Sequence, residues 1–260
     1  MTQKGNVSLS LISSLLGRSV PVFRLDVQRL VAAAVREIGL ASALLIAALG
    51  AMAFLAIADE VAEGETHALD LAVLRALRVE GRPEALVGPE WLHVAAVDVT
   101  ALGSVAVLSL IILLAFALLA SLRRWGEAVL LLGGALGGVS ISQGLKAVFG
   151  RERPDLAYRA VEAVNASFPS GHAMLSAVVF LTLGVLTARF SDRRRVKVLA
   201  ISAAVLLSLL VGASRVYLGV HWASDVLAGW SVGAAWAMIC WLAAYLVRRR
   251  IKPSSASDAT

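Results

Sequence analysis

The sequence predicts an all-α, polytopic membrane protein: a bundle of six transmembrane helices with additional interfacial helices. The first observation is composition, because 59% of the 260 residues are hydrophobic and only 16% are charged. Soluble domains average about 45–50% apolar and about 25% charged residues. The second observation is a series of long apolar runs. The third is the uneven distribution of Lys and Arg between those runs.

Six apolar runs are long enough to cross a membrane, since a bilayer core of about 30 Å needs roughly 20 apolar residues per helix. The first run follows 38 polar or mixed residues and is longer than the apolar core of a signal peptide, so we interpret it as an uncleaved span. The runs lie near residues 39–58, 101–121, 126–147, 171–190, 197–214 and 226–247.

The basic residues orient these spans. Sixteen of the 24 Lys and Arg residues lie in residues 1–38, in the turns near 122–125 and 189–197, or after residue 247. Six spans put all four segments on one side, which the positive-inside rule makes the cytoplasm, with both termini inside. The net charge of +6 is therefore explained by topology, and we expect no nucleic-acid partner. The eight basic residues on the outer side are Arg75, Arg78, Arg82, Lys146, Arg151, Arg153, Arg159 and Arg215.

The spans also divide the chain. We predict a cytoplasmic, partly amphipathic segment over residues 1–38, a membrane domain over 39–247, and a basic, disordered cytoplasmic tail over 248–260. Within the third run, the sequence GGALGG has glycines at the spacing that lets membrane helices approach closely.

The outer segment 59–100 is long and contains an amphipathic stretch. Residues 66–81 have apolar side chains at roughly helical spacing, with Arg75 and Arg78 on the opposite face. This pattern predicts a helix that lies on the membrane surface.

Three polar stretches fall on the predicted outer face: KAVFGRERP at 146–154, FPSGH at 168–172 and SRVYLGVHWASD at 214–225. Each has an ordinary explanation by itself, as a snorkelling cation, an N-cap at Ser170 or a capping His–Asp contact. Together they supply cations, helix-start amides and two histidines. That combination suits phosphoryl transfer, in which catalysis is mostly positioning and charge stabilisation. No carboxylate cluster of the kind that holds Mg²⁺ accompanies them, so we expect no metal or other cofactor.

The residue types predict individual roles. Arg grips phosphate in a bidentate manner and Lys acts as a point charge. The amides at the start of the helix near Gly171 form an anion site. Asp225 follows His221 by four residues, so both share a helix face if the sixth helix begins near there. A carboxylate hydrogen-bonded to one imidazole nitrogen would leave the other nitrogen free as a base or nucleophile. His172, beside a bound phosphate, would act as an acid. The residues alone do not decide which histidine attacks, although the carboxylate partner favours His221.

The same stretches resemble the three signature motifs of the type-2 phosphatidic acid phosphatase superfamily, which also includes vanadium haloperoxidases. Those motifs run K-x6-R-P, P-S-G-H and S-R-x5-H-x3-D, and this chain matches every signature position within about residues 100–247. The resemblance implies that His221 attacks phosphorus to give a phosphohistidine, with Asp225 orienting its ring. It implies that His172 protonates the leaving group before water hydrolyses the intermediate. By the same resemblance, the phosphate oxygens are held by Lys146, Arg153, Ser170, Gly171 and Arg215.

We therefore expect a metal-independent lipid phosphate or diphosphate phosphatase at the outer face of a bacterial inner membrane, with the bilayer and a phosphorylated lipid as its partners. Candidate substrates are undecaprenyl diphosphate, phosphatidic acid, phosphatidylglycerol phosphate and a lipid A phosphate. Two alternatives stay open: a lipid-to-lipid phosphotransferase, and a non-catalytic protein that binds or transports phospholipids. The complete His172, His221 and Asp225 set disfavours the second, because binding alone needs no oriented nucleophile.

Overall fold

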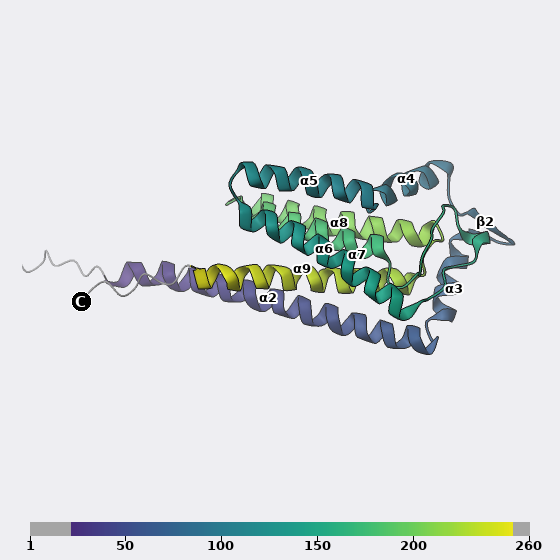
Figure 1. Cartoon of the computed structure of the whole chain (residues 1–260), viewed down its shortest axis with the longest axis horizontal. Helices are drawn as coiled ribbons and strands as arrows, with labels where there is room; N and C mark the ends of the chain where they lie inside the picture. Colours follow the sequence, from purple (N-terminus) through teal and green to yellow (C-terminus); the bar gives the residue numbers. More distant parts are fainter. Residues whose placement is uncertain (1–21, 252–260) are drawn as a thin grey trace, which may run out of the picture. The chain divides into compact units, whose positions relative to one another are not determined.

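The computed structural model describes residues 22–251, with side chains described for residues 39–248. The predictions made for residues 1–21 and 252–260 lie outside the described residues. A compact unit begins at Ala43 and contains the elements discussed below, apart from the first part of α2. The predicted limits of the N-terminal segment and the tail stay predictions. The elements, seen in Figure 1, are α2 (Val22–Glu63), α3 (His67–Ala76), β1 (Arg78–Val79), β2 (Arg82–Leu86), α4 (Glu90–Ala101), α5 (Val105–Ser121), α6 (Trp125–Phe149), the short 3-10 helix η1 (Leu156–Tyr158), α7 (Gly171–Arg189), α8 (Arg194–Tyr217) and α9 (Ala223–Ile251).

Five of the described helices are long and apolar enough to cross a membrane: α2, α6, α7, α8 and α9. The pair α4–α5 makes a sixth span if it is counted as one, with a bend of 50°. Helix α5 has 17 residues, which is about 25 Å of helix and short of a bilayer core of about 30 Å. The bend lies at residues 102–104, where Ser104 caps α5 by accepting a hydrogen bond from the Val107 amide at 3.3 Å. The predicted multi-pass, helical membrane fold is confirmed.

The outer segment differs from the prediction of one surface helix over residues 66–81. Helix α3 ends at Ala76, and the chain then forms the antiparallel pair β1–β2. Arg78 therefore leaves the helix and is buried, with only 6% of its surface exposed. Its guanidinium donates to the carbonyls of Tyr217 (3.0 Å) and Tyr158 (2.5 Å). The prediction of Arg78 on the polar face of a helix is wrong, because the helix ends before Arg78 and these carbonyls bind its guanidinium.

Helix α7 lies at the centre of the bundle. In its most apolar 18-residue window 56% of the residues are buried, against 33% or less in the other spans. It packs closely on α9 through Gly229 and Gly233, where an added Cβ would lie 2.7 Å from the Ser170 carbonyl and 2.6 Å from the Met174 carbonyl. Small residues four apart let two membrane helices approach in this way. The contact brings the start of α7 against the start of α9.

The predicted close approach at GGALGG is confirmed for some of its glycines. A Cβ at Gly137 would strike the Trp236 ring of α9, and one at Gly138 would lie 3.3 Å from Leu175 of α7. A Cβ added to Gly133 would have no neighbouring atom within 4 Å. The stretch therefore serves helix packing on one of its faces.

A glycine turn ends α8 and directs the chain into the third motif. Gly219 adopts φ +70, a left-handed conformation that side chains disfavour. The Val220 amide reaches back to the Arg215 carbonyl at 3.2 Å and the Gly219 amide to the Val216 carbonyl at 2.9 Å. This Schellman arrangement terminates the helix and turns the chain so that His221 faces the bundle.

Candidate active site

The three motif stretches meet around a cavity of about 340 Å³. The start of α7 is joined to α9 by the Ser170 amide, which donates to the Asp225 carbonyl at 2.9 Å. Both of these residues are completely buried. The other six residues predicted for the site line the cavity, and they are Lys146, Arg153, Gly171, His172, Arg215 and His221.

The imidazole of His221 is held between a carboxylate and a guanidinium. Its Nδ1 lies 3.3 Å from Oδ2 of Asp225, and because an ionised carboxylate only accepts hydrogen bonds, Nδ1 carries the proton. Its Nε2 then has the lone pair and lies 3.1 Å from Nη1 of Arg153. Helix α9 begins at Ala223, so the expected shared helix face is wrong, but the two side chains meet across the first turn. The ring presents an unprotonated Nε2 at the cavity wall.

The Asp225 carboxylate is fixed by further donors. The Ser167 hydroxyl donates to Oδ2 at 2.5 Å, and the Trp222 amide donates to the same oxygen at 2.9 Å. Arg151 donates to Oδ1 at 2.7 Å. These contacts leave the carboxylate one orientation toward His221.

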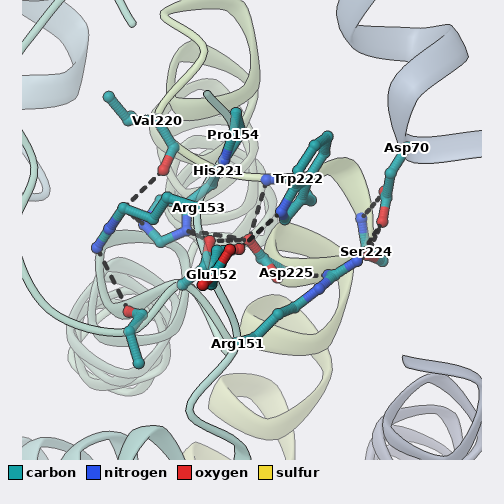
Figure 2. Close-up of polar contacts among 12 residues, drawn as sticks. Asp70, Arg151, Glu152, Arg153, Pro154, Val220, His221, Trp222, Ser224 and Asp225 are labelled. Atoms are coloured by element: carbon teal, nitrogen blue, oxygen red, sulfur yellow. Dashed lines mark hydrogen bonds and ion pairs between the residues drawn. The ribbon is translucent and has the colours of Figure 1, made fainter. Parts of the chain in front are cut away.

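Arg151 connects Asp225 to Asp70 of α3 (Figure 2). Its Nη2 donates to Oδ2 of Asp70 at 2.8 Å, while Nη1 binds Asp225. Asp70 also accepts from the Ser224 amide at 2.9 Å and from its hydroxyl at 2.5 Å. Both carboxylates are buried, with 3% and 0% of their surface exposed. A single arginine thus forms ion pairs with two buried carboxylates.

The cavity cations are held mainly by backbone carbonyls. Arg153 donates from Nε to Asn165 at 2.9 Å and from Nη1 to Val220 at 2.6 Å. The Lys146 ammonium donates to the Ala166 carbonyl. Among the described residues no ion pair joins these two cations to a carboxylate. Their charge is therefore available to an anion in the cavity.

Buried polar atoms without partners also lie at this site. The Ser170 hydroxyl and Nε of Arg215 have no hydrogen-bond partner among the described residues, although Arg215 Nη1 donates to Thr100 Oγ1 at 3.2 Å. Ser170 occupies the N-cap position of α7, as predicted, but its side chain makes no capping hydrogen bond. Buried groups of this kind are rare and call for an explanation. Here they accompany helix-start amides, which attract anions.

His172 lies in the first turn of α7 and lines the same cavity. A Cβ added to Gly103 would lie 3.2 Å from Cδ2 of its ring, so the bend between α4 and α5 packs directly against the imidazole. Thr100 from the same segment contacts Arg215. The second span therefore completes a wall of the site.

The arrangement is suited to a phosphate group. An unprotonated imidazole nitrogen, a second histidine, three cations and a helix N-terminus converge on one cavity. In the described part of the chain, no group of three His, Cys, Asp or Glu residues is placed to hold a metal ion.

Comparison with known proteins agrees with this geometry. The model of the PAP2 superfamily matches residues 127–249. The chain is 30% identical over 184 residues to the phosphatidylglycerophosphatase B of Bacillus subtilis, spanning 69% of this chain and 85% of that protein. The chain belongs to the PAP2 superfamily. The predicted resemblance is confirmed.

Other PAP2 relatives are similar over different lengths. An undecaprenyl-diphosphatase of Sulfolobus acidocaldarius is 41% identical over 68 residues, 26% of this chain and 29% of that one. The crystal structure of a transmembrane PAP2-type phosphatidylglycerolphosphate phosphatase from Bacillus subtilis superposes with a TM-score of 0.69 and 27% identity, over 80% of this chain and 98% of that one. The LpxE structure from Aquifex aeolicus shares the fold, with a TM-score of 0.51 and 22% identity over 66% of this chain and 94% of that one. The phosphatidylglycerolphosphate phosphatase relatives support a membrane lipid phosphatase, whereas the LpxE structure supports the fold alone.

The protonation of His221 gives this PAP2 protein a testable pH dependence. Burial lowers the pKa of His221 from 6.5 to about 4. The unfolded chain thus binds a proton near pH 6.5 that the folded protein does not bind until about pH 4, so stability falls as the pH drops through this window. We expect His221 to cost about 3 kcal/mol of unfolding free energy between pH 7 and 4.

Thermal unfolding of purified wild type and His221→Gln at a series of pH values measures this effect. The difference in unfolding free energy between the two proteins should change by about 3 kcal/mol as the pH falls from 7 to 4. Parallel curves would show that His221 does not titrate in this way.

Sequence reasoning did not assign roles to several residues that contact the motif residues in this PAP2 site. The sequence places Arg151 on the outer side, where the positive-inside rule does not account for a cation, and this position is a usable signal. Asp70 lies in the predicted surface helix, and Ser167 lies one residue before the FPSGH stretch. Their importance depends on contacts with Asp225 from distant parts of the chain, which sequence spacing does not reveal.

Proposed function

We propose that the protein is a lipid phosphate phosphatase in which His221 is the nucleophile. The observation that carries this proposal is the position of His221 Nε2, which lies 3.1 Å from Nη1 of Arg153 at the wall of a cavity that Lys146, Arg153 and Arg215 line. An imidazole with its other nitrogen on a buried carboxylate is an oriented nucleophile, and the cations hold the oxygens of the group it attacks.

The reaction proceeds in two steps. Nε2 of His221 bonds to phosphorus in line as the bond from phosphorus to the lipid oxygen breaks. The electron pair stays on that oxygen, which takes a proton from His172. Water then attacks the phosphohistidine and gives a proton to His172, the nitrogen–phosphorus bond breaks, and phosphate leaves. Asp225 stabilises the positive imidazole that forms in the first step.

The anion is bound by groups that do not react. Lys146, Arg153 and Arg215 face the phosphate oxygens, with Ser170 and Gly171 at the start of α7. Catalysis of phosphoryl transfer consists mostly of positioning the phosphate and stabilising its charge, and these groups do both.

The substrate is a membrane lipid with a terminal phosphate or diphosphate, because the site lies at the end of a bundle of apolar spans. We place phosphatidylglycerol phosphate first, since the relative of which this chain spans 85% is a phosphatidylglycerophosphatase. Undecaprenyl diphosphate, phosphatidic acid and a lipid A phosphate are the competing substrates. By the distribution of basic residues, the site faces outward from a bacterial inner membrane with both termini in the cytoplasm.

A panel of these lipids tests the proposal. The full chain, purified in detergent, should release inorganic phosphate from at least one of them, fastest from phosphatidylglycerol phosphate. Radiolabel retained on a second lipid would show a phosphotransferase instead. Tight lipid binding with neither release of phosphate nor transfer of phosphate to a second lipid would show a binding or transport protein.

Metal independence is a separate prediction. Excess EDTA should leave the rate of phosphate release within about twofold, because chelation abolishes function only where a metal is required. The control is the same enzyme dialysed without EDTA. Loss of activity that added Mg²⁺ restores would contradict a metal-free mechanism.

A further inference from the structure

Ser142 on α6 has a buried hydroxyl that the mechanism above leaves unused. The residue is 1% exposed, and its Oγ has no hydrogen-bond partner among the described residues. Transfer of a hydroxyl into an apolar environment without a hydrogen bond is unfavourable. A buried hydroxyl without a partner therefore calls for an explanation.

Other helical serines in this chain behave differently. Ser140, two residues earlier on α6, donates to the Leu136 carbonyl at 3.1 Å. Ser208 and Ser231 likewise donate to the carbonyl four residues before them, each at 2.8 Å. This back-bonding is the usual way for a serine to satisfy its hydroxyl inside an apolar helix. The Ser142 hydroxyl does not make this bond.

The position of Ser142 explains where the hydroxyl is directed. Ser142 precedes Lys146 by four residues, so both lie on one face of α6, and both line the cavity. A Cβ added to Gly171 would lie 3.5 Å from Oγ of Ser142 and 3.8 Å from Cε of Lys146. The hydroxyl therefore lies between the ammonium side chain and the first residue of α7, where helix-start amides attract an anion.

We propose that Ser142 is a further phosphate-binding residue, whose hydroxyl donates a hydrogen bond to a non-bridging oxygen of the substrate phosphate. This rests on the proposed function, since it assigns one more donor to the same anion. The hydroxyl is neutral, so it adds a donor without adding repulsion among the three cations. It would act with Lys146 and the Gly171 amide on the side of the phosphate that faces α6.

The test compares Ser142→Ala with Ser140→Ala, its matched control on the same helix. A hydrogen bond to a charged acceptor is strong enough that its loss weakens binding about ten- to a hundredfold. We expect Ser142→Ala to lower kcat/KM for the preferred lipid and to raise the vanadate inhibition constant by that factor. Ser140→Ala should match the wild type in both measurements.

Thermal unfolding without an added anion separates binding from folding. Ser142→Ala removes an unpartnered buried hydroxyl, so its unfolding temperature should equal or exceed that of the wild type. The rise in unfolding temperature on adding vanadate should be smaller for Ser142→Ala than for Ser140→Ala. A purely structural serine would instead lower stability and leave the vanadate inhibition constant unchanged.

Two failures are distinguishable. If the wild type is active and vanadate-sensitive but Ser142→Ala stays within about twofold of it in kcat/KM and in the inhibition constant, the Ser142 assignment alone is overturned. If the wild type releases no phosphate from any lipid and vanadate does not raise its unfolding temperature, the proposed function fails. The role of Ser142 then fails with it.

Discussion

His221→Ala is expected to lower kcat for phosphate release by at least about 10⁴-fold, the largest effect of any single substitution, because it removes the atom that bonds to phosphorus. Binding of a non-hydrolysable phosphonate analogue of the lipid should be largely kept, since Lys146, Arg153 and Arg215 remain on the cavity wall. Steady-state kinetics and analogue titration measure the two quantities separately.

A chemical readout identifies the intermediate. Wild-type enzyme mixed with phosphorus-labelled lipid and quenched in alkali should contain an acid-labile, base-stable phosphoenzyme, which His221→Ala should lack. Arg215→Ala is the informative contrast, because loss of a phosphate-facing cation should weaken analogue binding as well as turnover. Phosphate release by purified His221→Ala at the wild-type rate would refute the nucleophile assignment.

The second large effect is expected for Arg151→Met. Arg151 lies between the buried carboxylates of Asp70 and Asp225, at 2.8 Å and 2.7 Å. Removing one partner of a buried ion pair leaves an uncompensated charge and costs about 3–5 kcal/mol of unfolding free energy. Asp225 also loses the donor to its Oδ1, so kcat should fall by about tenfold or more as His221 loses its orientation. Denaturation in detergent and steady-state kinetics measure both.

A double-mutant cycle with Asp70→Asn tests whether this network is the cause. If Arg151 stabilises the fold through its ion pairs with the two carboxylates, the combined variant should lose less unfolding free energy than the sum of the two single variants. Arg159→Met is the matched control, since Arg159 is in the same loop but donates to the Pro154 carbonyl at 2.7 Å and should cost less than about 1.5 kcal/mol. Equal losses of unfolding free energy for Arg151→Met and Arg159→Met would show that the ion pairs of Arg151 with Asp70 and Asp225 do not stabilise the fold.

Some features of this chain are local in sequence and were therefore predictable. An apolar run of about 20 residues specifies a span wherever it occurs, because backbone groups in lipid must bond within their own helix. The bend in the second span was not predicted, because the run 101–121 is mostly apolar and only Gly103 and Ser104 mark the place where it bends. The position of the break between α4 and α5 depends on the packing of residues 102–104 and on the capping of α5 by Ser104.

The candidate site divides in the same manner. The motif spacing predicted His221, Asp225 and the cations as a group, because each of them belongs to a short polar stretch at or beside the end of a span. Ser142 and Asp70 were not predicted: one lies inside an apolar run and the other inside an amphipathic helix. Neither position differs in pattern from ordinary helix residues, and both became candidates only through their surroundings.

The sequence by itself determined that this protein is a multi-pass PAP2 membrane protein, since hydropathy and motif spacing are read along the chain. The tertiary structure alone decided how the motifs are used. The Gly229 and Gly233 contact between α7 and α9 brings Ser170 to Asp225, and Arg151 connects Asp225 to α3. The reason is that hydrogen bonds and ion pairs at this site join residues tens of positions apart. Such contacts exist only after the helices have packed.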